Sequence, residues 1–194
     1  TYLLGGLSGT SALGLGVNSL NVGRNNESTT YSGNLSGSGS LTKVGSGVLQ
    51  LSGSNSISGP TVVSGGVLAF ASTAGLQGTS GVSLGDTATL RYVGGAAAFG
   101  KNVTVTGGTA SIENAGGAAL TLAGTLSKDG TTLRLIGGPI SVTGTITGPS
   151  ANSDLVVAGT ASVSFLSANT YVGPTSVIQS STLAYGVAGA IPSN

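Results

Sequence analysis

Acidic side chains are the residues of this sequence with the most evident chemistry, because the chain has no His and no Cys. Two carboxylates held a few ångströms apart can act as acid and base in polysaccharide cleavage. The five carboxylates are spread over the sequence, at Glu27, Asp86, Glu113, Asp129 and Asp154. Most stand beside small or polar residues typical of turns, so we expect solvated surface charges. A stacked fold could still bring distant carboxylates together, and a polysaccharide-active enzyme therefore stays an alternative.

Metal and cofactor chemistry has little support in the residue types. Zinc sites and Ser-His-Asp or Cys-His centres need His or Cys. Calcium needs only oxygen ligands, but the G-G-x-G-x-D motif of calcium-binding β-rolls is missing. The Gly-rich stretch 33–47 lacks the Gly-Lys-Ser/Thr ending of a phosphate-binding loop. We therefore predict no catalytic residue, no cofactor and no metal, and a protein that is not an enzyme.

The composition also bears on partners. Charged residues make up 6% of the 194 residues, against roughly a quarter in a typical globular domain. The net charge is +1 and the six basic residues are scattered, which gives no electrostatic footprint for nucleic acid. No apolar run approaches the length needed to span a bilayer. We predict no nucleic-acid partner and no membrane span.

Short strands account for the hydrophobic pattern better than helices do. Leu49 and Leu51 alternate with Gln50, a period of two that indicates a half-buried strand. Similar short alternating pieces follow along the chain, bounded by Gly, Ser, Asn and Pro. The 36 Gly residues interrupt almost every window that a helix would need, at about 1 kcal/mol for each helical position.

A group of turn residues occurs twice. Asn55, Gly59, Pro60, Thr61 and Val63 recur 114 positions later, as Asn169, Gly173, Pro174, Thr175 and Val177. A lead-in at 41–45 recurs at 126–130, an offset of 85. Because the two offsets differ, we interpret the segments around 41–70 and 155–185 as diverged copies of one unit. Both would lie in a longer series within a single domain that spans 1–194.

The repeated residues have structural roles in this interpretation. Asn tolerates the left-handed conformation and its amide caps stacked backbone, whereas Pro fixes φ at the start of a turn. The predicted structural turn residues are Asn55, Gly59, Pro60, Asn169, Gly173 and Pro174. Lys43 and Lys128, which share a position in the two lead-ins, are expected to be solubilising charges beside a strand edge. Phe70, Phe165 and Tyr171 are expected to pack inside.

Repeated short strands with turns fit a sandwich, a barrel or a solenoid. The internal copies and the small, weakly charged side chains favour the solenoid, in which each turn lies about 4.8 Å from the next. With about 20 residues per turn, the chain would make roughly nine or ten turns and a rod on the order of 45 Å.

The stretch 41–70 also resembles a known family. Its Leu41-Thr42-Lys43, Leu49-x-Leu51-Ser52-Gly53-x-Asn55 and Gly59-x-Thr61-x-Val63 elements stand in the places of the autotransporter-associated β-strand repeat, also called the passenger-associated transport repeat. The resemblance implies a right-handed parallel β-helix in a secreted protein of the bacterial cell surface. It implies no catalytic residue.

These observations lead to a functional hypothesis. We expect an all-β, extracellular structural protein that forms surface or matrix filaments, because both ends of the sequence are apolar and without a charged cap. Its partner would be further copies of itself, joined through the solenoid ends. The first alternative is an adhesin or passenger segment that binds a cell surface or a glycan along the rod. Ice binding is a weaker one, suggested by the Thr-x-Thr motifs at 104–106 and 145–147.

Overall fold

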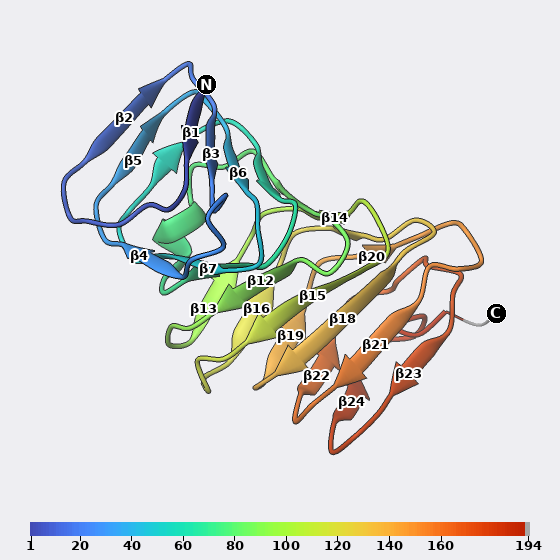
Figure 1. Cartoon of the computed structure of the whole chain (residues 1–194). Helices are drawn as coiled ribbons and strands as arrows, with labels where there is room; N and C mark the ends of the chain where they lie inside the picture. Colours follow the sequence, from blue (N-terminus) through green and yellow to red (C-terminus); the bar gives the residue numbers. More distant parts are fainter. Residues whose placement is uncertain (193–194) are drawn as a thin grey trace.

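A computed structural model describes residues 1–192 of the chain, which is a parallel β-solenoid of about nine turns. Every pairing between its named strands is parallel. The strands hold two to six residues each, because turn residues interrupt the chain at short intervals. The predicted all-β solenoid is confirmed. Figure 1 shows the blue N-terminal turns at one end of the stack and the red C-terminal turns at the other.

Two faces of the solenoid run through almost the whole stack. The first face contains eight strands in the order β1 (Tyr2–Leu4), β3 (Leu20–Val22), β6 (Leu41–Lys43), β9 (Thr61–Val63), β11 (Val82–Leu84), β14 (Val103–Val105), β17 (Leu126–Ser127) and β20 (Ile146–Thr147). The second face contains eight strands in the order β4 (Thr29–Tyr31), β7 (Val48–Leu51), β10 (Val67–Phe70), β12 (Thr89–Tyr92), β15 (Thr109–Asn114), β18 (Thr132–Gly137), β21 (Leu155–Ala158) and β23 (Thr175–Val177).

The third face is split into two sheets. Its N-terminal part contains β2 (Leu13–Gly16), β5 (Leu35–Gly37) and β8 (Ser56–Ile57). Its C-terminal part contains β13 (Ala97–Phe99), β16 (Leu120–Leu122), β19 (Ile140–Val142), β22 (Ser162–Phe165) and β24 (Thr182–Tyr185). Between the two parts one turn of the solenoid carries a 3-10 helix, η1 (Thr73–Leu76), where the other turns carry a strand.

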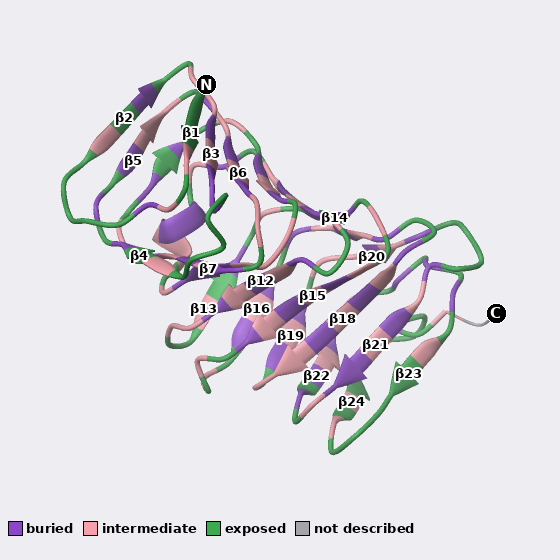
Figure 2. Ribbon diagram, in the orientation of Figure 1, coloured by how far each residue is buried: buried purple, intermediate pink, exposed green. Residues whose placement is uncertain are grey.

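Side chains that point inward form one continuous core, and each stacks on its equivalent in the next turn. On the second face Leu49, Leu68 and Leu90 are aligned from strand to strand and are buried. Full burial of such a side chain contributes about 1.5–3 kcal/mol relative to exposure. The ring of Phe70 lies 5.2 Å from the ring of Tyr92 and 5.2 Å from that of Phe99. Figure 2 shows the resulting alternation of buried and partly exposed residues along the strands.

Phe70, Phe165 and Tyr171 all lie in this core, as predicted. Within residues 1–192, no helix has the length and apolar character needed to cross a bilayer.

Candidate functional site

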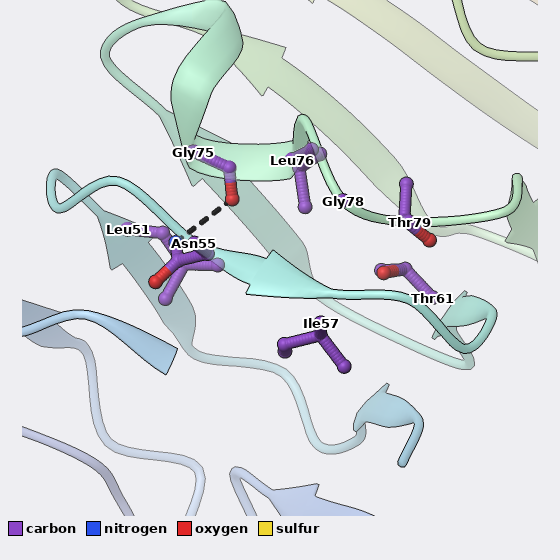
Figure 3. Close-up of a pocket in the computed structure, with 8 residues that line it drawn as sticks. All are labelled: Leu51, Asn55, Ile57, Thr61, Gly75, Leu76, Gly78 and Thr79. Carbon is purple, nitrogen blue, oxygen red and sulfur yellow. Dashed lines mark hydrogen bonds between the residues drawn. The ribbon is translucent and has the colours of Figure 1, made fainter. Parts of the chain in front are cut away.

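The predicted turn residue Asn55 joins three successive turns of the solenoid. Its Oδ1 accepts a hydrogen bond of 2.7 Å from the N–H of Leu35 in the preceding turn. Its Nδ2 donates one of 2.8 Å to the carbonyl of Gly75 in the following turn, drawn as a dashed line in Figure 3. The side-chain amide of Asn55 thus takes the place of backbone partners. It satisfies the N–H of Leu35 in the preceding turn and the carbonyl of Gly75 in the following one.

Asn169 makes the same pair of contacts in the second copy. Its Oδ1 accepts a hydrogen bond of 2.7 Å from the N–H of Ile146, and its Nδ2 donates to the carbonyl of Ala190. Both Asn side chains are buried. The two residues therefore have one geometry, although their neighbours in sequence differ.

The Gly and Pro residues of the two turns are also equivalent. A Cβ added to Gly59 would lie 2.4 Å from the carbonyl oxygen of Gly39, and one added to Gly173 would lie 2.4 Å from the carbonyl of Ser153. Only a residue without a side chain lets adjacent turns approach so closely. The carbonyl oxygen of Pro60 accepts a hydrogen bond from the N–H of Leu41 at 3.1 Å.

In the second copy the carbonyl oxygen of Pro174 accepts from the N–H of Leu155 at 2.9 Å. In both copies the Pro immediately before a strand therefore accepts a hydrogen bond from the first residue of the equivalent strand in the preceding turn of the solenoid.

The two copies nevertheless lie on different faces. In the first copy the repeated turn residues follow β7 on the second face and lead into β9 on the first. In the second copy they follow β22 on the third face and lead into β23 on the second. The offset of 114 therefore corresponds to five turns plus one further face. The offset of 85 instead relates β6 and β17, which lie four strands apart on the first face. This geometry explains why the two offsets differ.

Lys43 and Lys128 are not solubilising surface charges, and that prediction was wrong. Lys43 is 1% exposed and Lys128 is 0% exposed. Lys43 follows the buried Leu41 by two residues, and Lys128 follows the buried Leu126 by two residues. Because side chains two residues apart on a strand point to the same side, both lysines point inward. The alternation of the two strands was the signal in the sequence that could have located them.

The ammonium group of Lys43 is held by backbone carbonyls. Its Nζ donates to the oxygens of Val44 at 2.7 Å, Gly45 at 2.9 Å and Gly65 at 3.3 Å. These three acceptors match the three donors of an ammonium group. Burial lowers the pKa of Lys43 from its ordinary value of 10.5.

Lys128 has a different environment. Its Nζ donates to the carbonyl of Ser153 and lies 4.0 Å from the centroid of the Tyr171 ring, a cation–π arrangement. Burial lowers the pKa of Lys128 from 10.5 to about 8, and the charge of Asp154 opposes this effect. Tyr171, expected only to fill the core, thus also contacts a buried cation.

The carboxylates have two kinds of environment. Glu27, Asp86 and Asp129 are exposed, as expected for surface turns. Glu113 departs from this expectation, because it lies within β15 and forms an ion pair of 2.7 Å with Arg91 on β12. No group of three or more carboxylates that could hold a metal occurs within residues 1–192.

The Thr-x-Thr motifs lie on the outer side of the first face, but out of register with each other. Thr104 is aligned with Ser127, and Ser127 with Thr147. The first Thr of one motif therefore shares a column with the second Thr of the other. The two motifs do not build the repeated pair of Thr columns on which the ice-binding alternative depends.

The two ends of the solenoid expose groups that are buried elsewhere. At the C-terminal end Val177 on β23 and Tyr185 on β24 occupy core columns, yet they are 43% and 66% exposed. At the N-terminal end Tyr2 occupies the core column of Leu20 and is 44% exposed. The terminal strands β1, β2, β23 and β24 pair on one side only. Figure 2 shows the exposed residues of β23 and β24.

The parallel stack, the inward columns and the repeated turns define a β-solenoid repeat protein. Comparison with known families gives the particular repeat: residues 41–70 match the passenger-associated-transport-repeat family. This confirms the resemblance inferred from the sequence. Repeats of this family belong to autotransporter passenger domains, which are extracellular, and the family and fold are structural in character. Comparisons with curated proteins and with solved structures gave no match.

Proposed function

We propose that the protein is a structural subunit of an extracellular bacterial filament, at the cell surface or in a matrix, and that it assembles end to end. The observation that carries the proposal is the exposure of core-column residues in the last turn, Val177 and Tyr185 above all. Buried apolar groups left open at the end of a stack are satisfied by another turn of the same kind.

The strand edges support the same mode of association. The first face begins with β1 at the N-terminal end, whereas the second and third faces finish with β23 and β24 at the C-terminal end, so each end presents strand edges to another copy. Unpaired N–H and C=O groups on a terminal strand are a template for such pairing. A head-to-tail contact uses two different surfaces and does not close on itself, so it produces a fibre.

Electron microscopy of negatively stained protein over a concentration series tests the proposal. We expect uniform fibres whose length increases with concentration. A charge placed in the end surface, Tyr185→Glu, is expected to leave single rods, because an ion would be desolvated in the contact. The matched control is Thr104→Glu, a change at an exposed position on the side of the rod, which should leave the fibres intact.

Single rods of the unaltered protein at every concentration would overturn the proposal. If fibres persist in Tyr185→Glu and disappear in Thr104→Glu, the contact between copies lies on the side of the rod and not at its ends. Circular dichroism of each variant checks that its strands are retained.

A further inference from the structure

The break in the third face leaves two strand edges in the middle of the rod. β8 ends the N-terminal part of this face and β13 begins the C-terminal part, with η1 between them. Neither strand has a strand partner on the side of η1. The two edges differ in how η1 covers them.

The edge of β8 is closed by the chain around η1. The N–H of Asn55 donates to the carbonyl of Ala74 at 2.9 Å, and its side chain donates to Gly75. Thr79 Oγ1 donates to the carbonyl of Gly59 at 3.0 Å. The segment around η1 is therefore hydrogen-bonded to the chain on both sides of β8.

The edge of β13 is open. The N–H of Ala97 donates to Ala119 at 3.1 Å, and the carbonyl of Phe99 accepts from Ala123 at 2.9 Å, so both residues face β16. Alternate residues of a strand direct their main-chain groups to opposite sides, and the N–H and C=O of Ala98 consequently point toward η1. No backbone hydrogen bond joins η1 to β13 among the residues that the structure describes.

A cavity of about 240 Å³ lies between η1 and β13. Leu76 and Phe99 line it and are themselves buried, which makes part of its wall apolar. Gln77 and Lys101 also line it, and Lys101 is the one charged residue that does so. A Cβ added to Gly100 would meet no atom within 4 Å, so the space beside this edge is free of other main chain.

We propose that this cavity binds a short extended peptide segment of a partner protein, with a carboxylate beside Lys101 and its backbone paired to the edge of β13. Free main-chain donors and acceptors on a strand edge are matched by the backbone of an added strand. The apolar wall suits small aliphatic side chains of that segment. The single cation selects an acidic group over a basic one. This inference does not depend on end-to-end assembly.

Fluorescence anisotropy with a labelled probe peptide tests the inference. The probe alternates Val and Ser and ends in Asp, and a matched probe ends in Lys. We expect the acidic probe to bind more tightly than the basic one. Ala98→Pro removes the N–H that points away from β16, a change that strand edges tolerate. It should weaken binding at least about tenfold.

Thr121→Val on β16 is the matched control, because Thr121 is aligned with Ala98 but does not line the cavity, and this variant should bind like the unaltered protein. Lys101→Gln should reduce the preference for the acidic probe. If Ala98→Pro does not fold, a probe N-methylated at alternate residues tests the same backbone pairing and should not bind. Three results would each overturn the proposal: no binding of the acidic probe below about 1 mM, equal binding by Ala98→Pro, or displacement by an oligosaccharide that the same cavity binds better.

Discussion

The two copies of the repeated turn have the same hydrogen bonds but a different burial. In the first copy Val63 and Phe70 are 0% and 1% exposed. In the second copy Val177 and Tyr185, the latter matched to Phe70 as the last residue of Leu-Ala-Tyr against Leu-Ala-Phe after a one-residue insertion, are 43% and 66% exposed. Asn55 and Asn169 meanwhile make equivalent contacts. The local sequence therefore determines the conformation and hydrogen bonds of the Asn-Gly-Pro segment. How much apolar surface the repeated unit buries depends instead on whether another turn of the solenoid is stacked on it.

Truncation of the aromatic residue in each copy should give the largest contrast. Phe70→Ala removes a ring that packs against Tyr92 and Phe99, and such a core truncation costs about 3–5 kcal/mol of unfolding free energy. Tyr185→Ala changes an exposed residue, and we expect a change within about 0.5 kcal/mol. Urea denaturation followed by circular dichroism at low protein concentration measures both values.

Equal losses in these two variants would contradict the comparison, because they would mean that Tyr185 is buried in solution. Repeating the titration of Tyr185→Ala at high concentration separates burial within one copy from burial in a filament contact. Only the latter depends on concentration.

Much of the architecture could be predicted from local patterns, but the placement of each strand on a face could not. Alternation at Leu49 and Leu51 predicted strands, and the paired Asn-Gly-Pro turns predicted a repeated unit. The face on which each copy lies could not be predicted, because a strand sequence is the same on any face. The strand edge of β13 was also missed, because it arises where the 3-10 helix at Thr73–Leu76 takes the place of a strand on the third face.

The burial of Lys43 and Lys128 was missed although the strand periodicity indicated it, because the interpretation gave more weight to the charge of Lys. Leu41 and Lys43 are two residues apart on one strand, and the same holds for Leu126 and Lys128 in the second lead-in. Their periodicity predicts that both members point inward, whereas the charge of Lys favours the surface. Backbone carbonyls and an aromatic ring outside these strands compensate the buried charges, and the sequence alone does not reveal such partners.

Removal of the Asn amides should give an intermediate contrast between the copies. Asn55→Ala leaves the N–H of Leu35 and the carbonyl of Gly75 without partners, at about 1–3 kcal/mol for each buried group. We expect a total loss of about 2–6 kcal/mol. Asn169→Ala should cost about 1–2 kcal/mol, because the last turn opens locally and lets water reach Ala190.

Hydrogen exchange of the Leu35 and Ile146 amides, beside denaturation, measures the two effects separately. Both amides donate to an Asn side chain in the unaltered protein. Faster exchange confined to the amide of the altered turn is expected. A larger loss of stability in Asn169→Ala than in Asn55→Ala would contradict the ranking of the two turns.

The smallest expected effect is the pH dependence of the unfolding free energy that the buried Lys43 and Lys128 cause. It is also the effect that best distinguishes the lead-in at 41–45 from the one at 126–130. The pKa of Lys128 is about 8 in the folded protein, and the unfolded chain should have the ordinary value of 10.5. Between these values the unfolded state holds more protons, so stability rises with pH and is lost as the pH falls toward 8, by about 1.4 kcal/mol per unit. From pH 8 to 9.5 we expect a gain of about 2 kcal/mol.

Denaturation midpoints at pH 8 and 9.5 measure this gain in the unaltered protein, Lys128→Met and Lys43→Met. Burial raises the pKa values of Tyr31 and Tyr171 above 10.0, so the range below pH 10 isolates the lysines. Lys43 also has a lowered pKa, but three carbonyls solvate its ammonium, whereas Lys128 has one carbonyl and a ring. Lys128→Met should therefore flatten the rise more than Lys43→Met does. The reverse order would show that carbonyl contacts stabilise these buried charges less than the Tyr171 ring.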